Sequence, residues 1–346
     1  MLKIVDKYII KQLTKTFLSS FIILTVLMLL AGIIQISHIV FARGITLNIL
    51  FKIFYQQATF VAIFTIPMAL TVAVNFVYAD FAKNNEIVAF QTSGISKLNI
   101  YKPALYFTIF VFLIAFLNVS SIAYKQRGEF HLTLLQLAKH RIYSKISERS
   151  FFHFSKGSVI YAETISPDTL ELKSIFLQTP REIIMAKEGR FWDSPEGTIF
   201  SMKNGNMYKE TGAAVEVATF REFNTLISPQ RFVQQAEEIR REPKYMSMWQ
   251  LFHTKSDFAR MQINKMFVLS FSVFILSLIA FSLGVISKAG KSAGFILCVG
   301  IFVLFYIFQI FGEGVAKSAN IPFYMWLPNI ILAIFGIILF LSVVRR

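Results

Sequence analysis

The sequence predicts a polytopic α-helical membrane protein with six transmembrane helices and a β-rich domain inserted between the third and the fourth. Of the 346 residues, 55% are hydrophobic and only 16% are charged, whereas a soluble domain carries about 25% charged residues. The charges are also unevenly spread, because six long apolar stretches contain no Asp, Glu, Lys or Arg. A charged segment with alternating polarity separates the first three stretches from the last three.

Each apolar stretch is long enough for one membrane-spanning helix. An α-helix needs ~20 apolar residues to cross about 30 Å of hydrocarbon. The stretches are continuously apolar rather than alternating, which excludes a membrane β-barrel. Before the first span, residues 1–16 combine a lysine every four residues with an apolar side, so we expect a short interfacial helix there. The charge-free stretches lie between residues 15 and 43, 52 and 80, 102 and 125, 265 and 288, 291 and 313, and 317 and 345.

The positive charges predict the topology. Lysines and arginines gather before span one, between spans two and three, between spans four and five, and after span six. The opposite short loops offer only Arg43, Lys52 and Lys317. By the positive-inside rule, both termini are cytoplasmic and the inserted domain is periplasmic. Topology thus accounts for the net charge of +15, and we expect no nucleic-acid partner.

Composition divides the chain into residues 1–124 with spans one to three, residues 125–260, and residues 261–346 with spans four to six. In the middle part several segments, such as Val215–Phe223, alternate apolar and polar residues between Pro, Gly and Asn turn residues. This pattern predicts a sandwich or an open barrel and leaves the strand order open. The single cysteine, Cys298, lies in span five, so no disulfide can form within the chain.

The sequence offers no recognisable catalytic or metal site. Its five histidines lack metal-ligand spacing, and no nucleophile elbow occurs. Gly290-Lys291-Ser292 resembles the end of a phosphate-binding loop, but Val285 stands where that loop needs a glycine. The segment also joins two membrane helices rather than a strand and a helix. We therefore expect a protein that is not an enzyme.

The loop between spans two and three predicts a short helix near residues 84–93. Asn84 or Asn85 is suited to its N-cap, Glu86 to its positive N-terminal end, and Gly94 to a left-handed residue after its end. This helix is either an ordinary surface helix or a docking helix for a cytoplasmic partner, with Glu86 as its charged anchor. One face would present Ile87, Phe90 and Gln91.

Charged residues at the outer ends of the spans form a second candidate site. Glu313 adjoins an apolar span at the outer end of span five, and an ionisable group in such a place is a functional candidate by default. The alternative is that Glu313 simply ends the span. Arg43, Lys52 and Lys317 are expected at the same level, where they would attract lipid phosphates or serve as ordinary loop charges.

The loop Asn85–Ser96 resembles the signature of the LptF/LptG family of lipopolysaccharide export permeases (YjgP/YjgQ type), in which a Glu precedes Ser-Gly-Ile-Ser. The number of spans and the position of the inserted domain are also similar. The resemblance covers residues 1–124 and 260–346, and the middle domain matches in position and strand content. One departure is Ser282, which stands where the family often has a proline. Further matching segments are Gly290–Gly294, Ile321-Pro322 and Trp326–Asn329.

The resemblance implies a non-catalytic permease subunit of an ABC-type exporter in the bacterial inner membrane. Such a subunit extracts lipopolysaccharide and passes it to a periplasmic bridge toward the outer membrane. It would pair with a second permease of the family, with a slight preference here for the F type. A dimer of a cytoplasmic ABC ATPase would bind the ATP, so this chain is expected to hold no cofactor. Lipopolysaccharide would enter between spans one and five of the pair, and the inserted domain, a jelly roll in the family, would join the β-domains of the bridge by strand addition.

The same resemblance assigns roles to both candidate sites. The helix near residues 84–93 would be the helix that couples the ATPase to the spans. Its expected ATPase-coupling residues are Asn85, Glu86, Ile87, Phe90, Gly94 and Ser96. The expected substrate-path residues are Arg43, Lys52, Glu313 and Lys317.

Two other functions remain open at this point. A permease of another ABC machine, for lipoprotein release or mechanotransmission, typically has four spans per chain rather than six. An ion-driven secondary transporter would show repeated halves and ionisable residues at mid-span, and the charge-free stretches argue against it.

Overall fold

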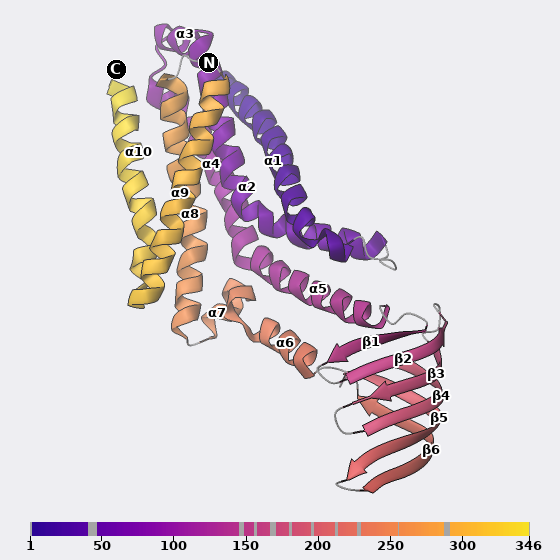
Figure 1. Cartoon of the computed structure of the whole chain (residues 1–346). Helices are drawn as coiled ribbons and strands as arrows, with labels where there is room; N and C mark the ends of the chain where they lie inside the picture. Colours follow the sequence, from indigo (N-terminus) through magenta and orange to yellow (C-terminus); the bar gives the residue numbers. More distant parts are fainter. Residues whose placement is uncertain are drawn as a thin grey trace. The chain divides into compact units, whose positions relative to one another are not determined.

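The chain forms two compact units in the computed structural model, Met1–Phe130 with Arg241–Arg346, and His131–Arg240 (Figure 1). The second unit is shorter in sequence than residues 125–260, the segment that composition separates from the spans. The reason is that residues at both ends of that segment pack against the membrane helices. The structure describes residues 2–40, 47–144, 149–155, 158–166, 171–179, 182–194, 197–211, 214–226, 230–254, 256–286 and 291–345.

The first unit is helical. Its α-helices are α1 (Leu2–Val40), α2 (Leu47–Lys83), α3 (Glu86–Thr92), α4 (Lys97–Leu117), α7 (Met248–Phe252), α8 (Asp257–Ile286), α9 (Lys291–Ala319) and α10 (Leu327–Arg345), and α5 (Tyr124–Ser144) begins in it. Shorter helical turns are η1 (Asn118–Ala123), η2 (Pro243–Tyr245) and η3 (Pro322–Trp326). Within the described residues, six helical segments are long and apolar enough to cross a membrane. They are α1, α2, α4 with η1 and α5, α8, α9, and η3 with α10.

Two of these segments are longer than expected. The lysine-rich residues at the N-terminus do not form a separate interfacial helix, because α1 is continuous from Leu2 to Val40. The third segment continues through the π-helical turn η1 into α5, where Asn118 donates a hydrogen bond to the Thr59 carbonyl of α2 (3.1 Å). A π-helical turn adds a residue to the helix and so changes the face that the following residues present.

Helix α8 packs against α2, α4 and α10 at the centre of the first unit. Side-chain hydrogen bonds tie it to each of these helices: Asn75 of α2 donates to the Ala280 carbonyl (3.3 Å), the hydroxyls of Thr108 of α4 and Ser277 lie 2.7 Å apart, and Asn329 of α10 donates to the Val268 carbonyl (2.8 Å). Lipid tails are as apolar as leucine, so such hydrogen bonds and close packing hold membrane helices together.

The second unit contains an antiparallel sheet inserted between the third and fourth spanning segments, which confirms the predicted fold class. The described strands are β1 (Ser150–Ser155), β2 (Ser158–Ile165), β3 (Glu171–Gln178), β4 (Glu182–Ser194), β5 (Gly197–Thr211) and β6 (Ala214–Leu226). They pair in sequence order, β1-β2-β3-β4-β5-β6, so each paired strand is joined to its neighbour by a hairpin. Helix α6 (Gln230–Arg241) follows the sheet.

The alternation of side chains shifts by one residue midway along the strands. In β3, Leu172, Ile175 and Leu177 are all buried on one face, although alternation from Leu172 would bury Ser174. Ser174 (φ 51°) and Asn204 of β5 (φ 54°) have left-handed backbones, and the pairing skips both of them. This irregularity keeps apolar residues from both halves of each strand on the same face.

Candidate functional site

Helix α3 forms the candidate coupling site at the end of the bundle where both chain ends lie (Figure 1). Glu86 is in its first turn, as expected, and Asn85 is the residue that precedes it. Asn85 has a left-handed backbone (φ 57°), and its side chain makes no capping hydrogen bond. After the helix, Gly94 adopts the left-handed conformation expected of it (φ 83°).

The sequence predicts that one face of α3 presents Ile87, Phe90 and Gln91 to its surroundings. In the structure, this face is partly packed against the helical bundle and partly exposed to solvent. Ile87 is buried, and the ring of Phe90 packs edge-on against Phe81 of α2 with centroids 6.2 Å apart. Val88 is 54% exposed and Gln91 is also exposed. Ile87 and Phe90 therefore position the helix, while Val88 and Gln91 are open to a partner.

The segment after α3 is tied to two spanning helices. The Ser96 hydroxyl accepts a hydrogen bond from the Asn99 backbone N–H (3.4 Å) and so caps α4. The Lys97 ammonium donates to the Val343 carbonyl at the end of α10 (2.9 Å), where a cation is favourable to the helix. Ser96, which was predicted to take part in coupling, is thus a capping residue that fixes the start of α4.

The second candidate site is an ionic cluster near the start of α8 and the end of α9. We call Lys265, Glu313 and Lys317 the outer cluster, after the side of the membrane that the positive-inside rule predicts for it. The Glu313 carboxylate lies 2.8 Å from the Lys265 ammonium and 2.9 Å from the Lys317 ammonium. The Glu313 and Lys265 side chains are 21% and 26% exposed, and that of Lys317 is 52% exposed. Two cations share one carboxylate, so the outer cluster carries one excess positive charge.

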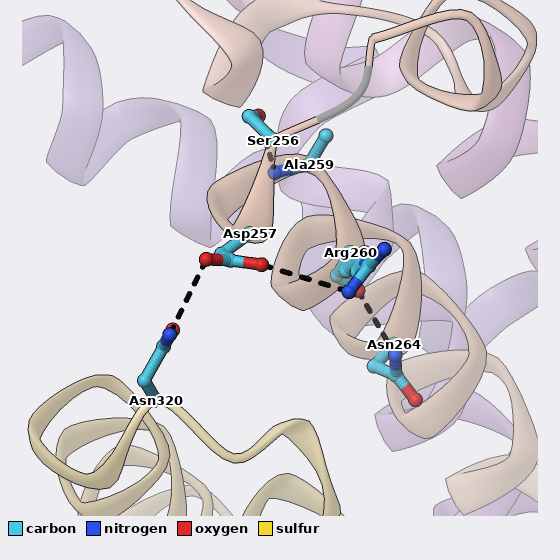
Figure 2. A network of polar contacts seen from close by, with 6 residues as sticks. All are labelled: Ser256, Asp257, Ala259, Arg260, Asn264 and Asn320. Atoms are coloured by element: carbon cyan, nitrogen blue, oxygen red, sulfur yellow. Dashed lines mark hydrogen bonds and ion pairs between the residues drawn. The ribbon is translucent and has the colours of Figure 1, made fainter.

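A polar network fixes the ends of the helices that carry the outer cluster (Figure 2). Asp257 in the first turn of α8 pairs with Arg260 (3.6 Å) and accepts a hydrogen bond from Asn320, just beyond α9 (3.3 Å). The Asn264 side chain accepts a hydrogen bond from the indole of Trp326 in η3 (3.1 Å). These contacts join the start of α8 to the end of α9 and thereby hold Lys265 opposite Glu313.

Buried polar groups lie next to the outer cluster along α8 and α9. Tyr306 and Gln309 precede Glu313 on α9 at helical spacing, and Gln262 of α8 is also buried. Gln309 is 3% exposed, and within the described residues neither of its amide atoms nor the Tyr306 hydroxyl has a hydrogen-bond partner. Leaving such groups unsatisfied costs about 1–3 kcal/mol each.

The structure brings together only part of the predicted outer site. Glu313 and Lys317 are in contact, whereas no ion pair among the described residues joins Lys52, which is exposed on α2, to the outer cluster. Arg43 lies outside the described residues. Sequence reasoning missed Lys265, whose signal is that it is the last charge before the fourth charge-free stretch.

A second missed cation is Arg127, which follows the third charge-free stretch. Its guanidinium donates to the Gln57 side chain of α2 (2.9 Å). It also lies over the rings of Phe60 and Phe130, 4.6 and 5.2 Å from their centroids. Such cation–π contacts hold the guanidinium in a defined place near the outer end of the third spanning segment.

The sheet carries a cavity of about 860 Å³ that crosses its strands. Tyr161, Phe176 and Met185 are paired across β2, β3 and β4 and form an apolar wall. Lys187 and Arg221 supply cationic groups beside them. The cavity therefore combines an apolar surface with positive charge, which suits an anionic amphiphile.

Six described helical segments that are long and apolar enough to cross a membrane, with an inserted antiparallel sheet, define a multi-pass membrane protein. Residues 7–342 match the family model of the lipopolysaccharide export system permease LptF/LptG. The chain belongs to this family, and it is accordingly an inner-membrane permease component.

Known relatives agree with this assignment. The chain is 20% identical to the lipopolysaccharide export system permease protein LptF of Escherichia coli (strain K12), over 97% of this chain and 94% of that protein. The LptF protein of Shigella flexneri gives the same values. An uncharacterised protein of Rickettsia prowazekii (strain Madrid E) is 21% identical over 45% of this chain and 43% of its own length.

Proposed function

We propose that this chain is the non-catalytic membrane subunit of an ABC-type exporter, and that it moves lipopolysaccharide from the inner membrane to a periplasmic bridge. It would act with a second permease of the family and with a dimer of a cytoplasmic ATPase, which binds and hydrolyses the ATP. The observation that carries the proposal is the architecture of α3, a short helix packed on the spans by Ile87 and open to a partner at Val88 and Gln91.

The proposed orientation places α3 and both termini in the cytoplasm and the sheet in the periplasm. An even number of spans puts both termini on one side of the membrane. The concentration of lysines and arginines beside those ends supports the cytoplasm as that side. The outer cluster would then lie at the periplasmic side of the membrane.

Movement of α3 would pass to several spans at once. Phe90 contacts Phe81 of α2, Ser96 caps α4, and Lys97 holds the end of α10. A push from a closing ATPase dimer on the exposed face of α3 would therefore displace three spanning helices together. Glu86, at the start of α3, would supply a charged contact to the ATPase.

Two spans are suited to face the second permease and the substrate. The apolar part of α1 is only 6% buried within this chain, and that of α9 is 28% buried. Large apolar side chains such as Ile34 and Phe311 are exposed along them. These faces support lateral entry of a lipid between α1 of one permease and α9 of the other.

The outer cluster is suited to the phosphates of lipopolysaccharide. Lys265 and Lys317 both pair with Glu313, so each is only partly neutralised. A phosphate with several acceptor oxygens can displace the carboxylate from one lysine and gain charge-assisted hydrogen bonds. The proposal therefore assigns the excess positive charge of the outer cluster to the substrate path.

The sheet would receive the lipid and pass it on. Its cavity offers an apolar wall for acyl chains and the cations Lys187 and Arg221 for anionic groups. Among the described strands, β1 and β6 each have one neighbour, so the sheet presents two edges. An unpaired edge is a template for strand addition by the β-domain of a bridge protein.

The test is gentle purification of the tagged chain from its own membranes, followed by identification of co-purified proteins and an ATPase assay. We expect an ABC ATPase and a second six-span permease, with lipopolysaccharide-stimulated activity. Glu86→Lys should lose the ATPase, whereas Glu163→Lys on β2, with the same charge change, should retain it. Recovery of the chain alone, without ATPase activity, would favour an ion-driven transporter, and stimulation by lipoproteins instead would favour another ABC machine.

A further inference from the structure

Helix α7 exposes large aromatic side chains although it is held tightly in the helical unit. Trp249 is 75% exposed and Phe252 is 61% exposed. The neighbouring side chains Met248 and Leu251 are 8% and 1% exposed. Helix α7 therefore has two apolar surfaces. Met248 and Leu251 lie in the protein core, whereas the described residues leave Trp249 and Phe252 uncovered.

The uncovered aromatic side chains are held in a fixed place. Met248 and Leu251 belong to one apolar cluster with Ala259 and Met266 of α8. The Ser247 backbone N–H donates to the Gln250 side chain (2.9 Å), which fixes the start of α7. A mobile loop could fold exposed apolar side chains inward, but this helix cannot, because its inward face is already filled.

The position of α7 along the chain places it at the outer boundary of the membrane. It directly precedes α8, whose first turns carry Asp257, Arg260 and Lys265 before the long charge-free stretch begins. These charges mark the depth at which α8 passes from the headgroup region into hydrocarbon. Helix α7 packs against this part of α8 and against η1, and so lies beside the helices at the same boundary.

Other aromatic residues lie at the same end of the helical unit. Trp326 of η3 donates its indole N–H to Asn264 of α8, and Phe323 of η3 is 58% exposed. Trp and Tyr are enriched at membrane interfaces, where an amphipathic ring contacts both acyl chains and headgroups. The side chains of α7 extend this aromatic zone around the start of α8.

We propose that α7 is an interfacial anchor, which inserts Trp249 and Phe252 at the boundary between headgroups and acyl chains in the outer leaflet of the membrane that the chain spans. We assign lipid as the occupant of the uncovered face, because α7 packs against α8 where its charged first turns meet the charge-free stretch. The anchor would fix the depth of the chain segment that enters span four. This inference depends on the membrane-spanning fold and is independent of the transported substrate.

The test measures the environment of Trp249 by fluorescence in the full chain reconstituted into nanodiscs of phosphatidylethanolamine and phosphatidylglycerol. Replacing Trp192 and Trp326 with Phe leaves Trp249 as the single tryptophan. We expect a blue-shifted emission that is strongly quenched by lipids brominated near the headgroup, less quenched by lipids brominated near the chain end, and protected from iodide. The control removes all three tryptophans and adds Phe151→Trp, an equally exposed position on β1 that should be quenched by iodide instead.

Two outcomes would overturn the proposal. Iodide-sensitive emission from Trp249 without bromolipid quenching would place α7 in water. Emission shielded from both quenchers would show that a protein surface covers α7. If Trp326→Phe disturbs folding through the loss of its contact with Asn264, the difference between the spectra of the wild type and Trp249→Phe gives the same information.

Discussion

The carboxylate of Glu313 in α9 lies 2.8 Å from the ammonium of Lys265 in α8, and both side chains are about three-quarters buried. This ion pair joins two spanning helices at their outer ends, where the polar network of Asp257, Asn264 and Trp326 also holds them. Lys317 shares the same carboxylate but is half exposed. The two lysines therefore have different tasks: Lys265 stabilises the helix pair, and Lys317 remains accessible to a ligand.

Glu313→Gln should destabilise the protein, because it leaves the partly buried Lys265 without a counter-charge. Complete loss of a buried partner costs about 3–5 kcal/mol, and partial exposure reduces the expected loss to about 1–3 kcal/mol. Thermal unfolding in detergent measures it. Lys317→Met is the matched control, since an exposed pair contributes about 0–1 kcal/mol. Equal losses in both variants would contradict the division of tasks.

Lys317→Glu should weaken contact with lipopolysaccharide while leaving the fold intact. The substitution turns the outer cluster from one excess positive charge to one excess negative charge, which repels phosphate. Photo-crosslinking of lipopolysaccharide from a probe placed in α9 measures the yield, and we expect a several-fold loss. The control Lys102→Glu makes the same charge change on an exposed residue of α4 that belongs to neither candidate site. An unaffected yield in Lys317→Glu would leave Lys317 as a loop charge.

The sequence predicts the spanning helices because lipid imposes one strong requirement, a long stretch without charge. It also predicts a helix near residues 84–93, since Glu86 and Gly94 are suited to its ends, and the structure has α3 at Glu86–Thr92. It does not predict which face of α3 is covered, because Ile87 and Phe90 are suited equally to a partner and to the bundle. Only the packing against Phe81 of α2 decides between them.

The outer site is only partly predictable for a related reason. In the sequence, Glu313 stands out as an ionisable residue at the end of an apolar span, and Lys317 as a loop charge expected at the same level. The structure places them four residues apart on one helix, where they form an ion pair. Lys265 is far from them in the sequence, and its pairing with Glu313 requires that α8 and α9 lie side by side. The buried polar residues Tyr306 and Gln309 carry no charge, so a charge-free stretch conceals them.

The two faces of α3 predict opposite effects for neighbouring substitutions. Ile87→Ala should lower the free energy of unfolding by about 2–5 kcal/mol, because it leaves a cavity in the core. Val88→Asp should leave unfolding almost unchanged and reduce co-purification of the ATPase, since Val88 is exposed. Thermal unfolding and quantitative co-purification separate the two effects. A stable Val88→Asp variant that retains the ATPase would argue against docking on this face.

Gln309→Met should stabilise the protein. Both amide atoms of Gln309 are buried without a hydrogen-bond partner among the described residues, and Met replaces them with apolar atoms of similar volume. Removal of these unsatisfied groups should raise the free energy of unfolding by about 1–3 kcal/mol. The control is Thr108→Val on α4, which removes the hydroxyl paired with Ser277 of α8 and should destabilise the protein. A loss of stability in Gln309→Met would mean that the amide has partners, such as ordered water, and that the polar region below the outer cluster is hydrated.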